Sequence, residues 1–452
     1  MADWCRVNIM KLFRRRSFSH GVHPPAHKDG TAQIPIRRLP FAPQLILPLG
    51  QHIGAPAQAL VKKGQDVVRG QPLAAAAGAM SVPLHAPATG RIREIKSMLT
   101  SRGSREPAIV LDVYEASTQE VLWREKRNLE ELDQDQLLQA IQDAGLVGLG
   151  GAAFPSHIKL RVPEDKKVDT LIINGCECEP YLTCDHRIML EYPDDLIRGI
   201  QLAMRASGTR RAIIGIEDNK MDAVKLLAER LRKASDIQVE AVETKYPQGS
   251  EKMLIKSLLN REVPAGGIPA DIGVVVNNVG TLAALGRLLP RGEGLMERVI
   301  TVTGSGVRRQ GNYLVPLGTP IGFILEQAGY EGGPNEFILG GPMMGPAVSS
   351  LEVPITKGSS GLLVLNEPSI RAESRHRWPC IKCGRCVSAC PMHLNPALLG
   401  QLALAGEYEE MAHDAHLNHC FECGCCSYVC PSNIPLVQLF RAAKAINREK
   451  AA

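Results

Sequence analysis

Aromatic residues and long apolar runs are both scarce in this sequence of 452 residues. Aromatics make up 4% of the chain, which argues against long single-stranded nucleic acid as a partner, because proteins hold it by stacking bases on aromatic rings. The charges nearly cancel, with 52 basic and 47 acidic residues, so bulk charge gives no sign of nucleic-acid binding either. Since the sequence has no run of about 18 apolar residues and no secretory pattern, we expect no transmembrane helix and a chain that stays in the cytoplasm.

The composition is otherwise that of a folded protein, with 44% hydrophobic and 22% charged residues. The length suggests about three domains and a smaller module. Changes in pattern divide the chain into a basic tail, a β module, an α/β domain, a β-rich domain and a helical, cysteine-rich domain. We expect these segments at 1–30, 31–125, 130–292, 293–368 and 370–452.

The N-terminal tail is basic at Lys11 and at 14–16, with apolar residues between the charges. Such a segment is either a poorly ordered tail or a contact with an anionic membrane surface or an acidic partner. In the β module, the stretches 61–74 and 85–92 resemble the barrel-sandwich fold of biotinyl and lipoyl carrier domains. Those carriers present a modifiable lysine between two such stretches, whereas residues 73–90 contain none, so the resemblance implies the fold without the carrier function.

Strands and helices alternate in the α/β segment, which predicts a doubly wound parallel sheet. The expected strands are 168–174, 212–216, 237–243 and 272–278, and the expected helices are 133–145, 193–208, 221–235 and 250–260. After this segment, the pattern over 298–365 predicts a small β-rich domain with one helix. The stretches 395–415 and 436–450 both have a helical period.

The cysteines supply the most specific motif. The run C-x2-C-x2-C-x3-C-P occurs twice, and it is typical of proteins that bind [4Fe–4S] clusters. The fourth cysteine of each run serves the other cluster, so we expect one cluster on Cys380, Cys383, Cys386 and Cys430 and the other on Cys420, Cys423, Cys426 and Cys390. Zinc is the alternative, but it usually takes two separated pairs of ligands. Cys425 is not required by the pattern and is expected to be a packed spare thiol. The helical character between the two runs favours an α-helical ferredoxin arrangement.

A glycine-rich loop and two polar clusters suggest a ligand site in the α/β domain. The loop GLVGLGGAAFP at 145–155 precedes a short helix, where backbone N–H groups can bind phosphate, although glycines also serve helix caps and close packing. The clusters at 174–180 and 277–281 follow predicted parallel strands, whose carboxyl ends carry ligands in open sheets. Their asparagines could bind the edge of a flavin ring, and Glu177 and Glu179 could accept from ribose hydroxyls. Turn formation and helix capping are the alternatives.

Three further cysteines, Cys176, Cys178 and Cys184, lie near Asp185 and His186 and could hold a metal. Because no matching pair of ligands occurs elsewhere, we interpret them as ordinary loop thiols.

Taken together, these motifs resemble the C subunit of the Rnf electron-transport complex, also called Rsx, over nearly the whole chain from HGVHPP at 20–25 to the second cysteine run. The middle of the chain is similar to the flavin- and NADH-binding subunit of respiratory complex I. The matching residues are the loop 145–155, with Ala153 in place of a glycine; Asn174, Glu177, Glu179 and Pro180; Gly249, Ser250 and Glu251 in part; and Val276, Asn277, Asn278 and Val279.

The resemblance implies a multidomain α/β protein. It would comprise a barrel-sandwich module, a Rossmann-like FMN/NADH domain, a β-grasp (SLBB) domain and an α-helical ferredoxin domain with two [4Fe–4S] clusters. It implies a noncovalent FMN and NADH as substrate. The residues implied for FMN are Gly148, Gly150, Gly151, Lys159, Asn174, Asn277 and Asn278, and those implied for NADH are Phe154, Glu179 and Glu251.

The resemblance also implies a function, that of a peripheral electron-input subunit of an ion-translocating oxidoreductase on the cytoplasmic face of the bacterial inner membrane. Its partners would be integral membrane and flavin-bearing subunits of the same complex and ferredoxin or flavodoxin. One alternative is a cluster-bearing adaptor with a degenerate flavin site, which docks ferredoxin on membrane partners. Another is a soluble flavoenzyme unrelated to membranes.

Overall fold

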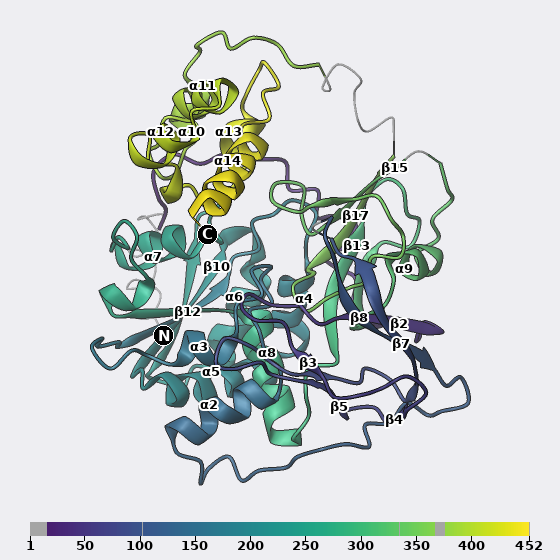
Figure 1. Ribbon diagram of the computed structural model, residues 1–452. Helices are drawn as coiled ribbons and strands as arrows, with labels where there is room; N and C mark the ends of the chain where they lie inside the picture. The colour runs from purple at the N-terminus through teal and green to yellow at the C-terminus, as the bar shows by residue number, and fades with distance from the viewer. Residues whose placement is uncertain (1–15, 102, 334, 367–375, 452) are drawn as a thin grey trace.

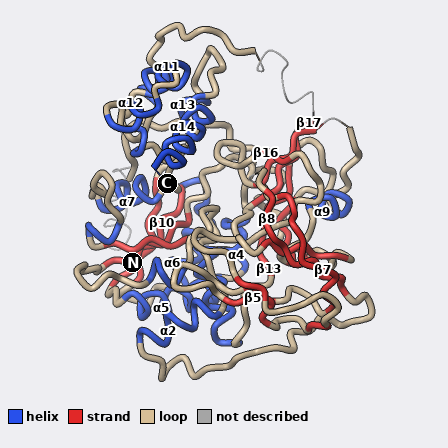
Figure 2. Tube along the Cα trace, in the orientation of Figure 1, coloured by secondary structure: helices blue, strands red, loops and turns tan. Residues whose placement is uncertain are grey.

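The computed structural model describes residues 16–101, 103–333, 335–366 and 376–451. A helical domain near the C-terminus lies above a parallel sheet flanked by helices, and two β-rich parts lie to one side (Figure 1). Figure 2 shows the same separation, with the strands gathered in the lower parts and the upper domain made of helices and loops. The four-part architecture expected from the sequence is confirmed.

The β module is built from two small antiparallel sheets, as expected for a barrel sandwich. The larger sheet has the order β2-β8-β7-β4 and the smaller has the order β3-β5-β6. Their bounds are β2 (Gln44–Pro48), β3 (Gln58–Ala59), β4 (Asp66–Val67), β5 (Pro72–Ala75), β6 (Leu84–His85), β7 (Gly90–Leu99) and β8 (Arg105–Val113). The loop between β5 and β6 rests on the α/β domain: Gln142 Nε2 donates to Ser81 O at 2.9 Å, and His157 Nε2 lies 2.8 Å from Ala79 O. A carrier domain would present its lysine on this loop, so its docked position agrees with the missing lysine.

The α/β domain has a four-stranded parallel sheet in the order β11-β10-β9-β12, and all four predicted strands are confirmed. The strands are β9 (Thr170–Gly175), β10 (Arg211–Glu217), β11 (Ile237–Val242) and β12 (Val274–Asn278). The helices are α2 (Gln134–Asp143), α3 (Ser156–Leu160), α4 (Cys184–Glu191), α5 (Pro193–Ser207), α6 (Met221–Arg230), α7 (Glu251–Leu259) and α8 (Val279–Leu288). Helix α7 packs on one face of the sheet through Leu254 and Leu258, whereas α5 and α8 cover the other.

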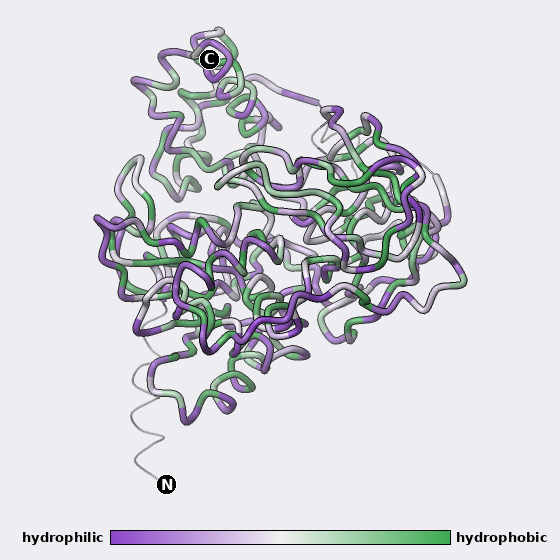
Figure 3. Tube along the Cα trace, turned by 60° about the horizontal axis from the view of Figure 1, so that its bottom comes forward, coloured by the Kyte–Doolittle hydropathy of each residue, from purple (hydrophilic) through white to green (hydrophobic). Residues whose placement is uncertain are grey.

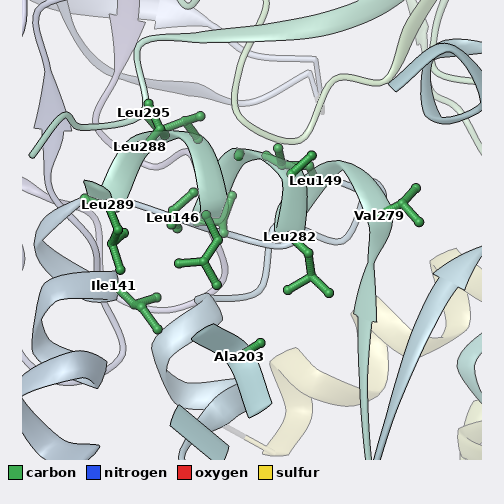
Figure 4. Packing of buried hydrophobic residues seen from close by; sticks show 14 of the residues in the cluster. Ile141, Leu146, Leu149, Ala203, Val279, Leu282, Leu288, Leu289 and Leu295 are labelled. Atoms are coloured by element: carbon green, nitrogen blue, oxygen red, sulfur yellow. The ribbon is translucent and has the colours of Figure 1, made fainter. Parts of the chain in front are cut away.

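The core beneath the other face of the sheet also anchors the glycine-rich loop. Figure 4 shows Leu146 and Leu149 of that loop near Leu282 of α8, with Ala203 of α5 below them. Helices α5 and α8 approach very closely, since a β-carbon at Gly199 would stand 1.8 Å from Leu282 O. The loop is therefore held from below by well-packed leucines.

The β-rich domain contains a six-stranded sheet in the order β1-β14-β13-β17-β15-β16 and the one predicted helix. Its elements are β13 (Glu297–Thr303), β14 (Gly311–Pro316), α9 (Ile321–Gln327), β15 (Asn335–Leu339), β16 (Ala347–Val348) and β17 (Gly361–Asn366). Strand β1 (Arg37–Arg38) comes from the N-terminal part of the chain and pairs in parallel with β14. Residues 37–38, which the sequence assigned to the β module, are therefore part of the β-rich domain's sheet.

The helical domain consists of α10 (Arg385–Ala389), α11 (Pro396–Ala405), α12 (Tyr408–His413), α13 (Cys425–Tyr428) and α14 (Leu436–Ala451). The helical character expected over 395–415 is confirmed, as the two helices α11 and α12. Gly406 adopts a left-handed φ of 81° and ends α11, which glycine does at little steric cost. Hydrophobic and hydrophilic residues alternate along the trace (Figure 3). Among the described residues, no helix is both long enough and apolar enough to cross a bilayer.

The expected basic tail is described only in part, because Lys11 and residues 14–15 lie outside the described residues. Residues 17–28, here called the strap, run along both the α/β domain and the helical domain. The amide of Val22 donates to Tyr246 O at 2.9 Å, and the amide of Gly21 donates to Ala389 O at 3.1 Å. The strap is thus part of the folded body.

Candidate functional site

Polar side chains predicted from the sequence meet at the carboxyl ends of β9 and β12. Asn174 of β9 and Asn278 of β12 are direct partners in the parallel register, and Asn277 precedes Asn278. Parallel strands present their carboxyl ends at one edge, so the expectation that the two asparagine clusters share this edge is correct. We call residues 148–151 together with Asn174, Asn277 and Asn278 the edge site.

The glycine-rich loop lies directly against Asn278. A β-carbon added at Gly150 would stand 3.3 Å from Asn278 Nδ2, and one added at Gly151 would meet nothing within 4 Å. Gly151 has a φ of 108°, a conformation that favours glycine. The loop is fixed by Leu149, whose amide donates to Thr281 Oγ1 at 2.8 Å and whose carbonyl accepts from the Arg298 guanidinium at 3.0 Å. The glycine backbone is therefore held firmly beside open space.

The asparagines of the edge site differ in what they bind. Asn174 Nδ2 donates to Gly249 O at 2.7 Å, and Asn278 Nδ2 donates to Asp185 Oδ2 at 2.6 Å. Asn277 is 3% exposed, and its side-chain Nδ2 has no hydrogen-bond partner among the described residues. A buried donor without a partner costs free energy unless a ligand satisfies it. This amide and the glycine cradle together fit a flavin mononucleotide, which offers acceptors at its ring edge and phosphate.

Two more predicted residues meet near the edge site. Lys159 of α3 donates to Glu251, the first residue of α7, so the residue implied for FMN and one implied for NADH form an ion pair. Phe154 is half-buried, and its carbonyl accepts from the Gly148 amide at 2.8 Å. Residues from four separate stretches of sequence are thus brought together.

Glu177 has a structural role in this geometry. Its Oε1 accepts from the Asp185 amide at 3.0 Å, and its Oε2 accepts from the His186 amide at 3.2 Å. Both carboxylate oxygens therefore bind backbone N–H groups at the start of α4. The geometry therefore supports helix capping, the alternative interpretation of Glu177. It does not support the expected contact between Glu177 and a ribose.

Glu179 lies under a loop of the β-grasp domain. Its Oε2 accepts from the Met343 amide at 3.0 Å, whereas Oε1 is buried without a partner among the described residues. Burial raises the pKa of Glu179 to about 7. This carboxyl group can therefore change its protonation state near neutral pH.

Three charged residues support the site but were not predicted from the sequence. Lys28 of the strap donates its Nζ to Glu177 O at 2.8 Å, to Glu179 O at 3.0 Å and to Leu182 O. Burial first, and then Glu177, raise the pKa of Asp185 to about 7. Arg298 is 4% exposed and holds the glycine-rich loop. Lys28 has no local pattern that separates it from a surface lysine, and the sequence places Asp185 only as a neighbour of three loop thiols.

The cysteine runs form two separate sets in the helical domain. Cys380, Cys383, Cys386 and Cys430 line one cavity of about 300 Å³, and every residue lining this cavity belongs to the helical domain. In the other set, the pKa of Cys426 is raised by burial first and then by Cys423, Cys420 and Cys390. Each set therefore combines three cysteines of one run with the last cysteine of the other, which is the crossed arrangement expected for two clusters.

The other thiols among the described residues are buried or have individual partners. Cys176 Sγ donates to Gly215 O at 3.6 Å, Cys184 Sγ donates to Glu177 Oε1 at 3.3 Å, and Cys178 Sγ accepts from the Gly249 amide at 3.3 Å. Cys425 is fully buried. Within the described ranges, no group of three or more His, Cys, Asp or Glu side chains is already arranged to hold a single metal ion.

Four family matches cover most of the chain. They are a "RnfC Barrel sandwich hybrid domain" at 16–115, a "Nuo51 FMN-binding domain" at 141–287, an "SLBB domain" at 299–347 and a "4Fe-4S dicluster domain" at 369–434. The cofactors expected from the sequence, FMN and iron–sulfur clusters, are therefore confirmed at the level of these domains.

Similar curated proteins span the same domains. The C subunit of the proton-translocating ferredoxin:NAD(+) oxidoreductase complex of Clostridium ljungdahlii is 43% identical over 96% of this chain and 94% of that relative. The C subunit of the Na(+)-translocating complex of Acetobacterium woodii is 39% identical over 84% of this chain and 86% of its own length. Among solved structures, the NAD+-reducing [NiFe]-hydrogenase is similar with a TM-score of 0.48 and 25% identity, over 62% of this chain and 54% of that chain. With its four domains and with relatives covered over 94% and 86% of their length, the chain belongs to the family of C subunits of the ion-translocating Rnf oxidoreductase complex.

Proposed function

We propose that this chain is the peripheral subunit through which an ion-translocating complex exchanges electrons with NADH, using FMN in the α/β domain and two [4Fe–4S] clusters in the helical domain. A bound flavin exchanges a hydride with nicotinamide and single electrons with clusters, which themselves carry one electron at a time. The observation that carries the proposal is the glycine cradle that lies against Asn278, at the strand end where the buried amide of the preceding residue, Asn277, has no partner among the described residues.

The residues of the edge site would divide the work of holding FMN. The backbone N–H groups at Gly150 and Gly151 would bind phosphate, because the space beside Gly151 is open and the side chain that borders Gly150 is that of Asn278, another residue of the edge site. Asn277 would donate to the ring edge. Lys159, oriented by Glu251, would add a positive charge near the phosphate.

The nicotinamide would enter beside Phe154 and Glu251, at the end of the site formed by the starts of α3 and α7. Glu179 is farther under the β-grasp loop, and its half-satisfied carboxyl group would respond to a ligand or a proton rather than serve as a permanent anion. None of these side chains is proposed to act as a covalent catalyst, since the chemistry belongs to the cofactors.

The cluster ligands are proposed as two crossed sets, with Cys380, Cys383, Cys386 and Cys430 in one and Cys420, Cys423, Cys426 and Cys390 in the other. The names of the similar proteins support ferredoxin as the other redox partner and further subunits of the same complex as the attachment to the membrane. We place the chain on the cytoplasmic face, where NADH and ferredoxin are found.

The substitution Asn277→Leu tests the flavin site. It removes the buried amide at similar volume, so the FMN-free protein should be as stable as the wild type or more stable, because an unsatisfied donor disappears. FMN affinity should fall about tenfold, the equivalent of one hydrogen bond worth roughly 1.4 kcal/mol. Asn174→Leu is the contrast, because it breaks the bond to Gly249 and should lower stability as well.

The measurement is a fluorescence titration of FMN onto FMN-free protein, together with thermal unfolding. Anaerobically purified wild type should release FMN on denaturation and be bleached by NADH. A protein that has intact clusters, binds no FMN and is not reduced by NADH would instead be the cluster-bearing adaptor, the alternative function given above.

A further inference from the structure

Tyr246 links the α/β domain to the helical domain. Its side chain is 1% exposed, and its hydroxyl donates to the carbonyl of Cys423 at 2.6 Å. Its backbone N–H and carbonyl both pair with Val22 of the strap at 2.9 Å. Around it, a small apolar cluster joins the two domains and contains Val22, Ala389, Cys423 and Cys425. A buried tyrosine whose hydroxyl donates to a carbonyl of another domain fixes the distance between the two domains at that point.

The same short segment reaches the edge site. Three residues after Tyr246, the carbonyl of Gly249 accepts from Asn174 Nδ2 at 2.7 Å, and the amide of Gly249 donates to Cys178 Sγ. Gly249 lies so close to the end of β9 that a β-carbon there would be 2.5 Å from Cys176 O. Residues 246–249 therefore connect an asparagine of the edge site with a cysteine of the second set.

The two cysteine sets differ in their surroundings. Cys390, Cys423 and Cys426 are 7–9% exposed, and the loop that carries Cys423 contacts Tyr246 and the β-grasp loop at Met343. By contrast, Cys380 and Cys383 are exposed, and the cavity of their set is lined by the helical domain alone. One set therefore faces inward, toward the α/β domain, and the other faces outward.

We propose that Tyr246 is a positioning residue that seats the inner cluster, the one on Cys390, Cys420, Cys423 and Cys426, against the edge site, so that this cluster exchanges electrons directly with the flavin. This inference rests on the proposed function. In each transfer one electron would pass between the flavin and the inner cluster, one being oxidised as the other is reduced, and the proton that the reduced flavin ring carries would leave to solvent as the ring is reoxidised. The outer cluster, on Cys380, Cys383, Cys386 and Cys430, then exchanges electrons with the external partner.

The hydroxyl of Tyr246 also affects the inner cluster electrostatically. Its O–H dipole presents its positive end to the carbonyl of a cluster ligand, which favours the reduced, more negative cluster. Tyr246→Phe keeps the ring and removes this donor. The midpoint potential of the inner cluster should become more negative, and that of the outer cluster should stay unchanged.

The experiment is a mediated redox titration of the full chain, followed by electron paramagnetic resonance, which needs neither NADH nor bound FMN. Tyr246→Phe is measured in two backgrounds: Cys383→Ala, which retains only the inner cluster, and Cys423→Ala, which retains only the outer one. Tyr428→Phe is the matched control. Tyr428 belongs to the helical domain, which carries both clusters, and it is 49% exposed, so its hydroxyl is not buried between the domains. Iron and sulfide counts check that the remaining cluster is present.

A negative shift in the Cys383→Ala background alone, or selective loss of the inner cluster's iron, supports the proposal. A shift in the Cys423→Ala background, or no shift in either, overturns it. Rapid mixing with NADH adds a separate readout: the remaining cluster should be reduced quickly in Cys383→Ala and slowly in Cys423→Ala. If NADH reduces nothing even in the wild type, the proposed function fails, while the titration still decides the role of Tyr246.

Discussion

The substitution Gly150→Val places a branched side chain in the glycine cradle of the edge site. A β-carbon at this position would stand 3.3 Å from Asn278 Nδ2 and 3.4 Å from Asn278 Cβ, which is tighter than an ordinary contact, and valine adds two methyl groups to it. Asn278 must therefore move. The loop cannot retreat easily, because Leu149 is bound to Thr281 and to Arg298.

The expected loss of FMN binding free energy in Gly150→Val follows from the two hydrogen bonds of Asn278. Its Oδ1 accepts from the Thr281 amide at 3.2 Å and caps α8, a contribution of about 1 kcal/mol. Its Nδ2 donates to the Asp185 carboxyl group, and such a bond contributes about 1.5–3 kcal/mol. If both are lost from the FMN-binding conformation, the binding free energy falls by about 3 kcal/mol, and FMN affinity falls about 100-fold.

The assay is a titration of FMN-free protein by flavin fluorescence, with iron counted in parallel. Gly64→Val is the matched control, since Gly64 is in the β module with a φ of 81°, and a β-carbon there meets nothing within 4 Å. It should cost stability through backbone strain but leave FMN affinity unchanged. If Gly150→Val binds FMN like the wild type, the loop is only a structural turn and the reasoning is refuted.

Three other changes have defined outcomes. Cys383→Ala should lower the iron content from about eight to about four atoms per chain, and zinc in place of iron in anaerobic preparations would contradict the cluster assignment. Lys220→Met leaves buried Glu217 unpaired and should lower the free energy of unfolding by about 3–5 kcal/mol. The double variant Lys220→Met/Glu217→Gln should recover much of this loss, and thermal unfolding measures the stability of both variants. Because burial raises the pKa of Glu179 from 4.5 to about 7, the folded state binds the extra proton between these values, so stability should fall as pH rises from 4.5 to 7. Glu179→Gln should remove this pH dependence of the unfolding free energy, which amounts to at most about 3 kcal/mol. Equal pH dependence in the wild type and in Glu179→Gln would contradict the assignment to Glu179.

The parallel sheet and the cysteine sets could be predicted from the sequence because their signals are local. Each strand of the sheet is a short apolar run, and each run of cysteines has a fixed spacing. The edge site could be predicted for a related reason: Asn174 and Asn278 both lie at the carboxyl ends of parallel strands, so topology alone brings them to one edge. The helical period over 395–415 was also local, but it did not give the number of helices, because the left-handed Gly406 divides the stretch into α11 and α12.

The contacts that join the domains could not be predicted, since they depend on residues far apart in the chain. Glu177 has the residue type expected to bind ribose, but the nearby start of α4 takes both of its oxygens. Tyr246 is surrounded by ordinary loop sequence, and only its contact with Cys423 distinguishes it. Strand β1 joins the sheet of a domain that begins more than 250 residues later.

The strap gives these long-range contacts a common physical reason. Electron transfer between two cofactors requires that the domains holding them keep a fixed separation, and the interface at Tyr246 is small. The strap adds bonds on both sides: Gly21 donates to Ala389 O, His20 Nδ1 lies 3.1 Å from the carbonyl of Cys390, and Lys28 binds the backbone that carries Glu177 and Glu179. Because prolines at 24–25 restrict the backbone between these anchors, the segment acts as a stiff connection rather than a loose one. The N-terminal segment therefore contributes directly to the geometry on which the proposed transfer between the edge site and the inner cluster would depend.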